Sequence, residues 1–132
     1  MAGKVSDNWL TLAQDDLTTA QTMLETARGL LLHVGLRCHE AVRETLTAAG
    51  AQQGGEVPAE TDSLLRLVAQ RPWKAVLDAR MLQTLEWLSA YPILESEGVQ
   101  DAGDLAVLLT PEKTAELLAR TKELCDWIGA QR

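Results

Sequence analysis

Apolar residues recur three and four positions apart through most of the chain, which is the spacing that places side chains on one face of an α-helix. The first stripe consists of Leu10, Ala13, Leu17, Ala20, Leu24 and Ala27. A second stripe, over residues 31–51, consists of Leu31, Val34, Cys38, Ala41, Val42, Leu46 and Ala49. The pattern therefore predicts two long amphipathic helices, the first capped by Ser6 or Asp7 and ended by Gly29.

Glycines and Pro58 then predict a loop over residues 50–60. After it, Thr61, Asp62 or Ser63 can cap a short third helix that carries Leu64, Leu65, Leu67 and Val68. Pro72 ends that helix or begins a fourth one, which continues from Trp73 to Tyr91. Pro92 predicts the end of the fourth helix because proline disfavours α geometry in the residue before it.

Residues 93–109 contain Gly98 and Gly103 among acids and predict an irregular segment, in which a helical turn over Leu105–Leu109 stays open. Thr110 followed by Pro111 then predicts a capped helix start. Its apolar face consists of Leu117, Leu118, Thr121, Leu124, Cys125 and Ile128. With no strand-like alternation, the chain is predicted to be all-α, an up-and-down bundle of about five helices forming one domain over residues 1–132.

Composition narrows the class of protein. The chain is 46% hydrophobic and 23% charged, as globular proteins are. It has no apolar run long enough for a membrane span, and Met1 to Asn8 does not resemble a signal peptide. We therefore expect a cytoplasmic protein without membrane partners. A net charge of −7 argues against a protein that grips DNA or RNA over its whole surface. The stretch with Arg66, Arg71, Lys74 and Arg80 includes Asp78 and is explained by a solvated helix face.

Residue types with metal or cofactor chemistry are sparse. Cys38 and Cys125 lie far apart without paired histidines, so they form no zinc-ligand spacing, and we expect reduced, buried thiols. No glycine-rich loop resembles a phosphate cradle. We expect no metal and no cofactor. The four tryptophans are interpreted as core or groove fillers rather than as base-stacking platforms: Trp9, Trp73, Trp87 and Trp127.

Both histidines, His33 and His39, lie on the predicted second helix. His39 and Arg43 are four residues apart and can share a face, which a charged surface explains most simply. Arg28 precedes His33 by four intervening residues, the spacing of a metal-independent RNase motif. One such pairing is unsurprising in a chain with several arginines, and coincidence is the favoured interpretation.

Polar residues also form a stripe along the second helix, at intervals of three or four: His33, Arg37, Glu40, Glu44 and Thr47. This stripe has two interpretations. It can consist of water-facing ion pairs, each worth only about 0.3 to 0.5 kcal/mol. It can also line a polar cleft that binds a nucleotide or a partner chain. From the residues alone the water-facing interpretation is favoured.

At this helix the chain resembles the HEPN domain family of prokaryotic toxin–antitoxin and nucleotide-associated proteins. Residues 38–46, Cys-His-Glu-Ala-Val-Arg-Glu-Thr-Leu, resemble the family segment of the type C-Q-Q-A-V-E-K-A-L. The order of the other matching segments agrees as well. They are Trp9-Leu10 with Ala13, Asp16-Leu17, Ala20 and Leu24; Thr61-Asp62-Ser63-Leu64 for T-H-D-L; Tyr91-Pro92 for R-Y-P; and Ala115 to Ile128 for the closing helix.

The chain also departs from the family pattern. Asp62 stands where the family often has His, and Ala90 where it has Arg before Tyr-Pro. Arg43 and Glu44 reverse the usual Glu-Lys order, and Thr47 replaces a common Lys. In catalytic members an Arg and a His on a late helix are thought to cleave RNA across a homodimer, whereas this chain has no histidine after His39. The resemblance therefore implies a degenerate, non-cleaving member.

The resemblance further implies a homodimer that acts by binding a nucleotide, RNA or a minimal nucleotidyltransferase partner. The expected ligand-binding residues are Arg37, Glu40, Arg43, Glu44 and Tyr91. A rival hypothesis is an RNase toxin, with His33 or His39 as general base and Arg28 or Arg37 beside it. A third hypothesis is a purely structural protein-interaction module.

Overall fold

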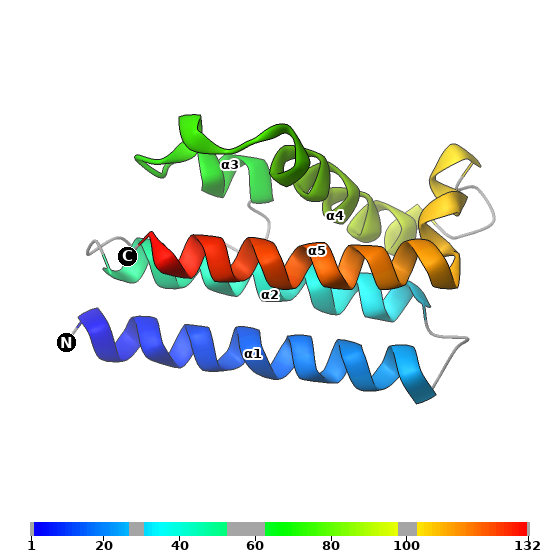
Figure 1. The fold of residues 1–132 in the computed structure, drawn as a ribbon, viewed down its shortest axis with the longest axis horizontal. Coiled ribbons are helices and arrows are strands. Elements are labelled where there is room, and N and C mark those ends of the chain that lie inside the picture. Colours follow the sequence, from blue (N-terminus) through cyan, green and yellow to red (C-terminus); the bar gives the residue numbers. More distant parts are fainter. Residues whose placement is uncertain (1, 27–30, 53–62, 98–102, 132) are drawn as a thin grey trace.

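The computed structural model describes residues 2–26, 31–52, 63–97 and 103–131. In these ranges the chain forms five α-helices, and none of the described residues lies in a β-strand (Figure 1). They are α1 (Ala2–Thr26), α2 (Leu31–Gln52), α3 (Leu64–Ala69), α4 (Ala79–Glu97) and α5 (Pro111–Ala130). The described ranges also contain two 3-10 segments, η1 (Lys74–Val76) and η3 (Gly103–Leu109). The predicted all-α bundle of about five helices is confirmed.

Helix α2 is the centre of the bundle. It contacts α1, α3, α4 and α5. Figure 1 shows α1 along one side of the α2 and α5 pair, with α3 and α4 along the other side. As a result, every residue from Ala41 to Ala51 is buried, polar side chains included. An amphipathic surface helix would leave one face in water, and the second half of α2 leaves none.

The core consists of the apolar faces that the sequence predicts. On α1, Ala13, Leu17 and Ala20 are buried, and on α4 the largest buried residues are Leu85, Leu88, Tyr91 and Leu94. The predicted face of α5 is buried in full. Each large side chain removed from water contributes about 1.5–3 kcal/mol, so these faces are the main stabilising term. None of the described helices is long and apolar enough to cross a membrane.

Three helix starts are fixed by side-chain caps. The Ser63 hydroxyl accepts a hydrogen bond from the backbone N–H of Arg66 at 3.1 Å, and the Thr110 hydroxyl accepts one from Lys113 at 3.3 Å. Both caps confirm the predicted starts of α3 and α5. At α4 the Asp78 carboxylate accepts from the N–H of Met81 at 2.8 Å. Each such cap contributes about 1 kcal/mol by satisfying a backbone donor that the helix itself cannot pair.

The amino end of α1 corrects one prediction. The helix begins at Ala2, so neither Ser6 nor Asp7 is its cap. Ser6 lies inside the helix with its side chain buried, because the chain is already helical before it. At the other end α1 extends to Thr26, and the predicted stop at Gly29 lies outside the described residues, as do Ala27, Arg28, Thr61 and Asp62. Helix α2 continues to Gln52, into the predicted loop, and residues 53–60 of that loop are likewise outside the description.

The fourth helix differs from the prediction at both ends. The segment after Trp73 forms the 3-10 turn η1, and extended backbone at Leu77 separates that turn from α4. The predicted stop at Pro92 is wrong, because α4 continues through this proline to Glu97. A proline inside a helix costs about 3 kcal/mol. Burial of Tyr91 and Leu94 on either side of it offsets that cost. Residues Leu105–Leu109, left open by the sequence, lie in the 3-10 segment η3.

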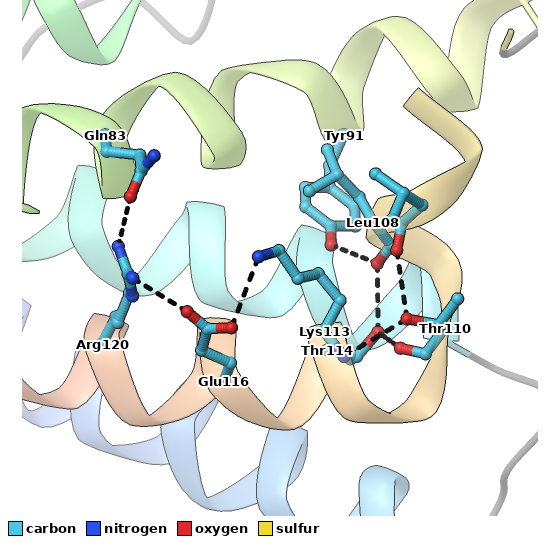
Figure 2. Close-up of polar contacts among 9 residues, drawn as sticks. Gln83, Tyr91, Leu108, Thr110, Lys113, Thr114, Glu116 and Arg120 are labelled. Carbon is cyan, nitrogen blue, oxygen red and sulfur yellow. Dashed lines mark hydrogen bonds and ion pairs between the residues drawn. The ribbon is translucent and has the colours of Figure 1, made fainter. Parts of the chain in front are cut away.

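Gly35 and Tyr91 fix how closely α4 approaches α2. The Tyr91 ring lies so close to Gly35 that a Cβ there would overlap ring carbon atoms. The Tyr91 hydroxyl donates to the carbonyl of Leu108 at 2.9 Å, and the Thr114 hydroxyl donates to the same carbonyl at 3.1 Å (Figure 2). One buried side chain thus joins α2, α4 and the junction of η3 with α5.

Replacing Gly35 by alanine should lower the free energy of unfolding by about 1–3 kcal/mol, because the added methyl group overpacks against the Tyr91 ring. Urea unfolding followed by tryptophan fluorescence measures this change. Gly129 on α5 is the matched control, since an added Cβ there meets no atom within 4 Å. Gly129→Ala should be neutral or stabilising by up to about 1 kcal/mol. Equal effects of the two substitutions would contradict the proposed packing.

Candidate functional site

The first two residues of the polar stripe of α2, His33 and Arg37, lie at the surface. The Arg37 side chain is 52% exposed, and its Nη1 donates to the Asp16 carboxylate of α1 at 2.8 Å. The Asp16 side chain is only 11% exposed. Arg37 therefore covers a carboxylate that the α1–α2 contact has removed from water, and its charge is engaged within the chain.

Glu44 lies seven residues after Arg37, about two helical turns further along α2, and it is buried near Asp16 in the contact between α1 and α2. It is 6% exposed, and its Oε1 is buried without a hydrogen-bond partner in the described part of the chain. Burial is the main cause that raises the pKa of Glu44, and the neighbouring Asp16 carboxyl group adds to it, bringing the pKa to about 9. At neutral pH Glu44 is therefore a neutral acid.

Arg43 is also internal rather than part of a ligand surface. It is 8% exposed, and its Nε and Nη2 both donate to Oε1 of Glu40, with an Nε distance of 2.9 Å. Its backbone carbonyl accepts from the Thr47 hydroxyl at 2.8 Å, which satisfies that buried threonine. A guanidinium held in this way compensates a neighbouring carboxylate and offers little to an external phosphate.

Tyr91 was predicted to bind a ligand, and the structure corrects this. The residue is 0% exposed and its hydroxyl is engaged by Leu108. Of the five expected ligand residues, Arg43, Glu44 and Tyr91 are thus internal, whereas Arg37 and Glu40 reach the surface. The burial of Arg43 and Glu44 depends on the packing of other helices around the second half of α2, which the sequence did not show.

A groove between α2 and α4 remains open where the stripe reaches the surface. It has a volume of about 320 Å³ and is lined by Leu36, Arg37, His39 and Glu40 of α2 and by Pro92 and Glu95 of α4. Burial lowers the pKa of His39, the charge of Glu40 opposes this, and that of Arg43 adds to it. His39 is therefore neutral at pH 7. We call this cavity the α2–α4 groove.

His33, the other histidine, is exposed and does not line the α2–α4 groove. Arg28, its partner in the RNase spacing, lies outside the described residues. Cys38 and Cys125 are free and buried, as predicted. Burial raises the pKa of their thiols to about 12 and about 11, so neither is a nucleophile at neutral pH. Among the described residues no group of three His, Cys, Asp or Glu side chains could hold a metal ion.

A polar cluster between α4 and α5 was missed by the sequence analysis. Arg120 of α5 donates a hydrogen bond to Gln83 of α4 at 2.8 Å (Figure 2). Arg120 also forms an ion pair with Glu116 at 2.8 Å, and Glu116 forms a second ion pair with Lys113 at 3.4 Å. Lys113 and Arg120 lie over the Trp87 ring, 4.0 Å and 4.3 Å from its centroid. The spacing of the three charged residues on α5 was visible, but nothing in the sequence showed that Trp87 would lie beneath them. The cluster fastens α4 to α5.

Trp73 and Trp127 form an aromatic pair. Their rings pack edge to face, with centroids 5.2 Å apart, and Trp73 is buried. Trp87 and Trp127 are partly buried against the core. These positions confirm that the three residues fill the core and its margins.

The protonated Glu44 makes stability depend on pH. Its pKa rises from 4.5 to about 9 on folding, so its stabilising contribution is complete below pH 4.5 and is lost as pH rises through 9. Between pH 7 and 8.5 the free energy of unfolding should fall by about 1–2 kcal/mol. This window avoids the titration of His39. Chemical denaturation at each pH measures the fall, which Glu44→Gln should abolish and the exposed Glu112→Gln should preserve. A wild-type stability that is flat over this range would disprove it.

The chain matches the family model of the HEPN domain over residues 6–131. Comparison with curated protein sequences gives no match. Comparison with solved structures likewise gives none.

Proposed function

The chain belongs to the HEPN domain family, and we propose that it is a non-catalytic binding module whose α2–α4 groove receives a partner protein. The observation that carries the proposal is the engagement of two arginines of α2, Arg37 in the polar stripe and Arg43 beside it. Arg37 is paired with Asp16, and Arg43 is paired with Glu40. A nucleotide or RNA ligand needs cations that are available to its phosphates, and the groove instead exposes carboxylates.

The kind of partner follows from the family. The family resemblance implies a homodimer and often a minimal nucleotidyltransferase partner, so we propose both for this chain. A surface groove of modest volume that is lined by both polar and apolar residues suits a side chain of such a partner. Leu36 and Pro92 supply the apolar part, and Glu40 and Glu95 supply the charge.

One observation favours a second candidate, an RNase. Arg37, His39 and Glu40 line the same groove, and a histidine that is neutral at pH 7 can act as a general base toward a ribose 2′-hydroxyl. The pairing of Arg37 with Asp16 opposes this candidate, because a transition-state phosphate would have to compete for the guanidinium. The RNase mechanism is therefore the runner-up.

Incubation with total RNA decides between the two candidates. We expect wild type, His39→Ala and His33→Ala all to leave the RNA intact on electrophoresis. His33→Ala is the matched control because His33 is exposed and lies outside the groove. Cleavage by wild type that is lost in His39→Ala and kept in His33→Ala would overturn the non-catalytic proposal and assign His39 as the base.

A thermal-shift series with ATP, GTP and AMP tests the nucleotide alternative. A ligand present at 100 times its Kd stabilises the folded state by about 2.7 kcal/mol. We expect no shift beyond that of an equal concentration of NaCl, because the arginines of the groove region are already paired. A saturable shift that Arg37→Gln removes would replace the partner protein by a nucleotide as the ligand.

A further inference from the structure

We propose that the α2–α4 groove recognises a lysine or arginine side chain of the partner, held between Glu40 and Glu95. This inference rests on the proposed function and names the chemistry of the contact. The groove contains carboxylate oxygens that accept no hydrogen bond from any described residue. The side chain of Glu95 on α4 makes no ion pair or hydrogen bond with any other described residue, and it is exposed.

Glu40, on the opposite wall, keeps half of its carboxylate available. Both hydrogen bonds from Arg43 end on Oε1, and no described residue donates to Oε2. The Glu40 side chain is 38% exposed, so Oε2 is within reach of a ligand. Arg43 thus positions this carboxylate while leaving one oxygen for an external donor. Two carboxylates on facing walls match the several N–H donors of an ammonium or guanidinium group.

The end of α4 adds to the preference for a cation. The helix ends at Glu97, so Glu95 lies in its last turn, and that turn contains no basic residue. The carbonyl groups of a helix carboxyl end carry partial negative charge, which cations stabilise. Here the end carries Glu95 instead, so the unfavourable charge of the turn is left for a ligand to balance.

The remaining lining residues fit the rest of such a side chain. Leu36 and Pro92 are half-buried apolar residues, on which the methylene stem of a lysine or arginine can pack while its charged end reaches the carboxylates. The chain's own cations do not fill the site. Arg37 is bonded to Asp16 of α1, and the neutral imidazole of His39 adds no positive charge.

The test uses a fluorescein-labelled hexa-arginine peptide and measures its dissociation constant by fluorescence anisotropy at fixed ionic strength. Hexa-citrulline, which replaces each guanidinium by a neutral urea, is the probe control. We expect the arginine peptide to bind at least tenfold more tightly than the citrulline peptide. Glu95→Gln should weaken arginine-peptide binding about tenfold, and Glu95→Lys should weaken it further.

Glu86→Gln is the matched control, since it removes the same charge from the same helix. Glu86 precedes Glu95 by nine residues, about two and a half helical turns, and so lies on the opposite face of α4. It should change the dissociation constant less than twofold. Equal weakening by Glu95→Gln and Glu86→Gln would reduce the effect to net charge and overturn the inference. Failure of the arginine peptide to bind wild type would overturn it as well.

These outcomes are separate from those that test the proposed function. Cleavage of RNA through His39 removes the binding-module proposal whatever the peptide does. If RNA stays intact and Glu95→Gln does not change the dissociation constant of the peptide, the protein remains a proposed binding module, but its groove binds something other than a cationic side chain. Because Glu95 is exposed and unpaired within the described chain, its substitution leaves folding intact, and circular dichroism checks this directly.

Discussion

The complete burial of the second half of α2 is the constraint on which the rest of the structure depends. Four helices surround it, so the polar residues in this stretch cannot reach water and must be compensated inside the protein. Arg43 is compensated by Glu40. Glu44 stays protonated beside Asp16, and the threonines donate to carbonyl groups one turn earlier. The buried polar side chains of α2 therefore have specific partners, some on neighbouring residues of α2 and one on α1.

This constraint also decides where a ligand can bind. A stripe of charged residues suggests a binding surface when the helix is considered alone. In the bundle, however, most of these residues are buried or paired within the chain. What remains at the surface is the α2–α4 groove, which Glu40 and Glu95 line from the two helices. The pairs that stabilise α2 thus engage the positive charges that a phosphate would require, which is the basis for the proposed cationic ligand.

Much of the fold could be predicted from the sequence because apolar spacing and local capping are local properties. Only nearby residues were needed to predict the apolar stripes of α1, α2 and α5 and the caps at Ser63 and Thr110. The continuation of α4 through Pro92 depends on burial of Tyr91 against Gly35, a contact over 50 residues away in sequence, and local rules gave the wrong helix end. Helix periodicity placed the polar residues of α2 on one face, but could not show that α1 would cover that face. Of the residues that line the α2–α4 groove, the sequence analysis named Arg37 and Glu40 as ligand residues and His39 under the RNase hypothesis.

The protonation state of Glu44 tests most directly whether the polar stripe is internal. Carbon-13 NMR of the glutamate side-chain carboxyl groups, with Glu44 assigned by comparison with Glu44→Gln, follows its titration in the folded protein. The account predicts a carboxyl that is still protonated at pH 7 and titrates with a pKa of about 9. A carboxyl that titrates near 4.5, as a water-facing glutamate does, would contradict it and return the stripe to the surface.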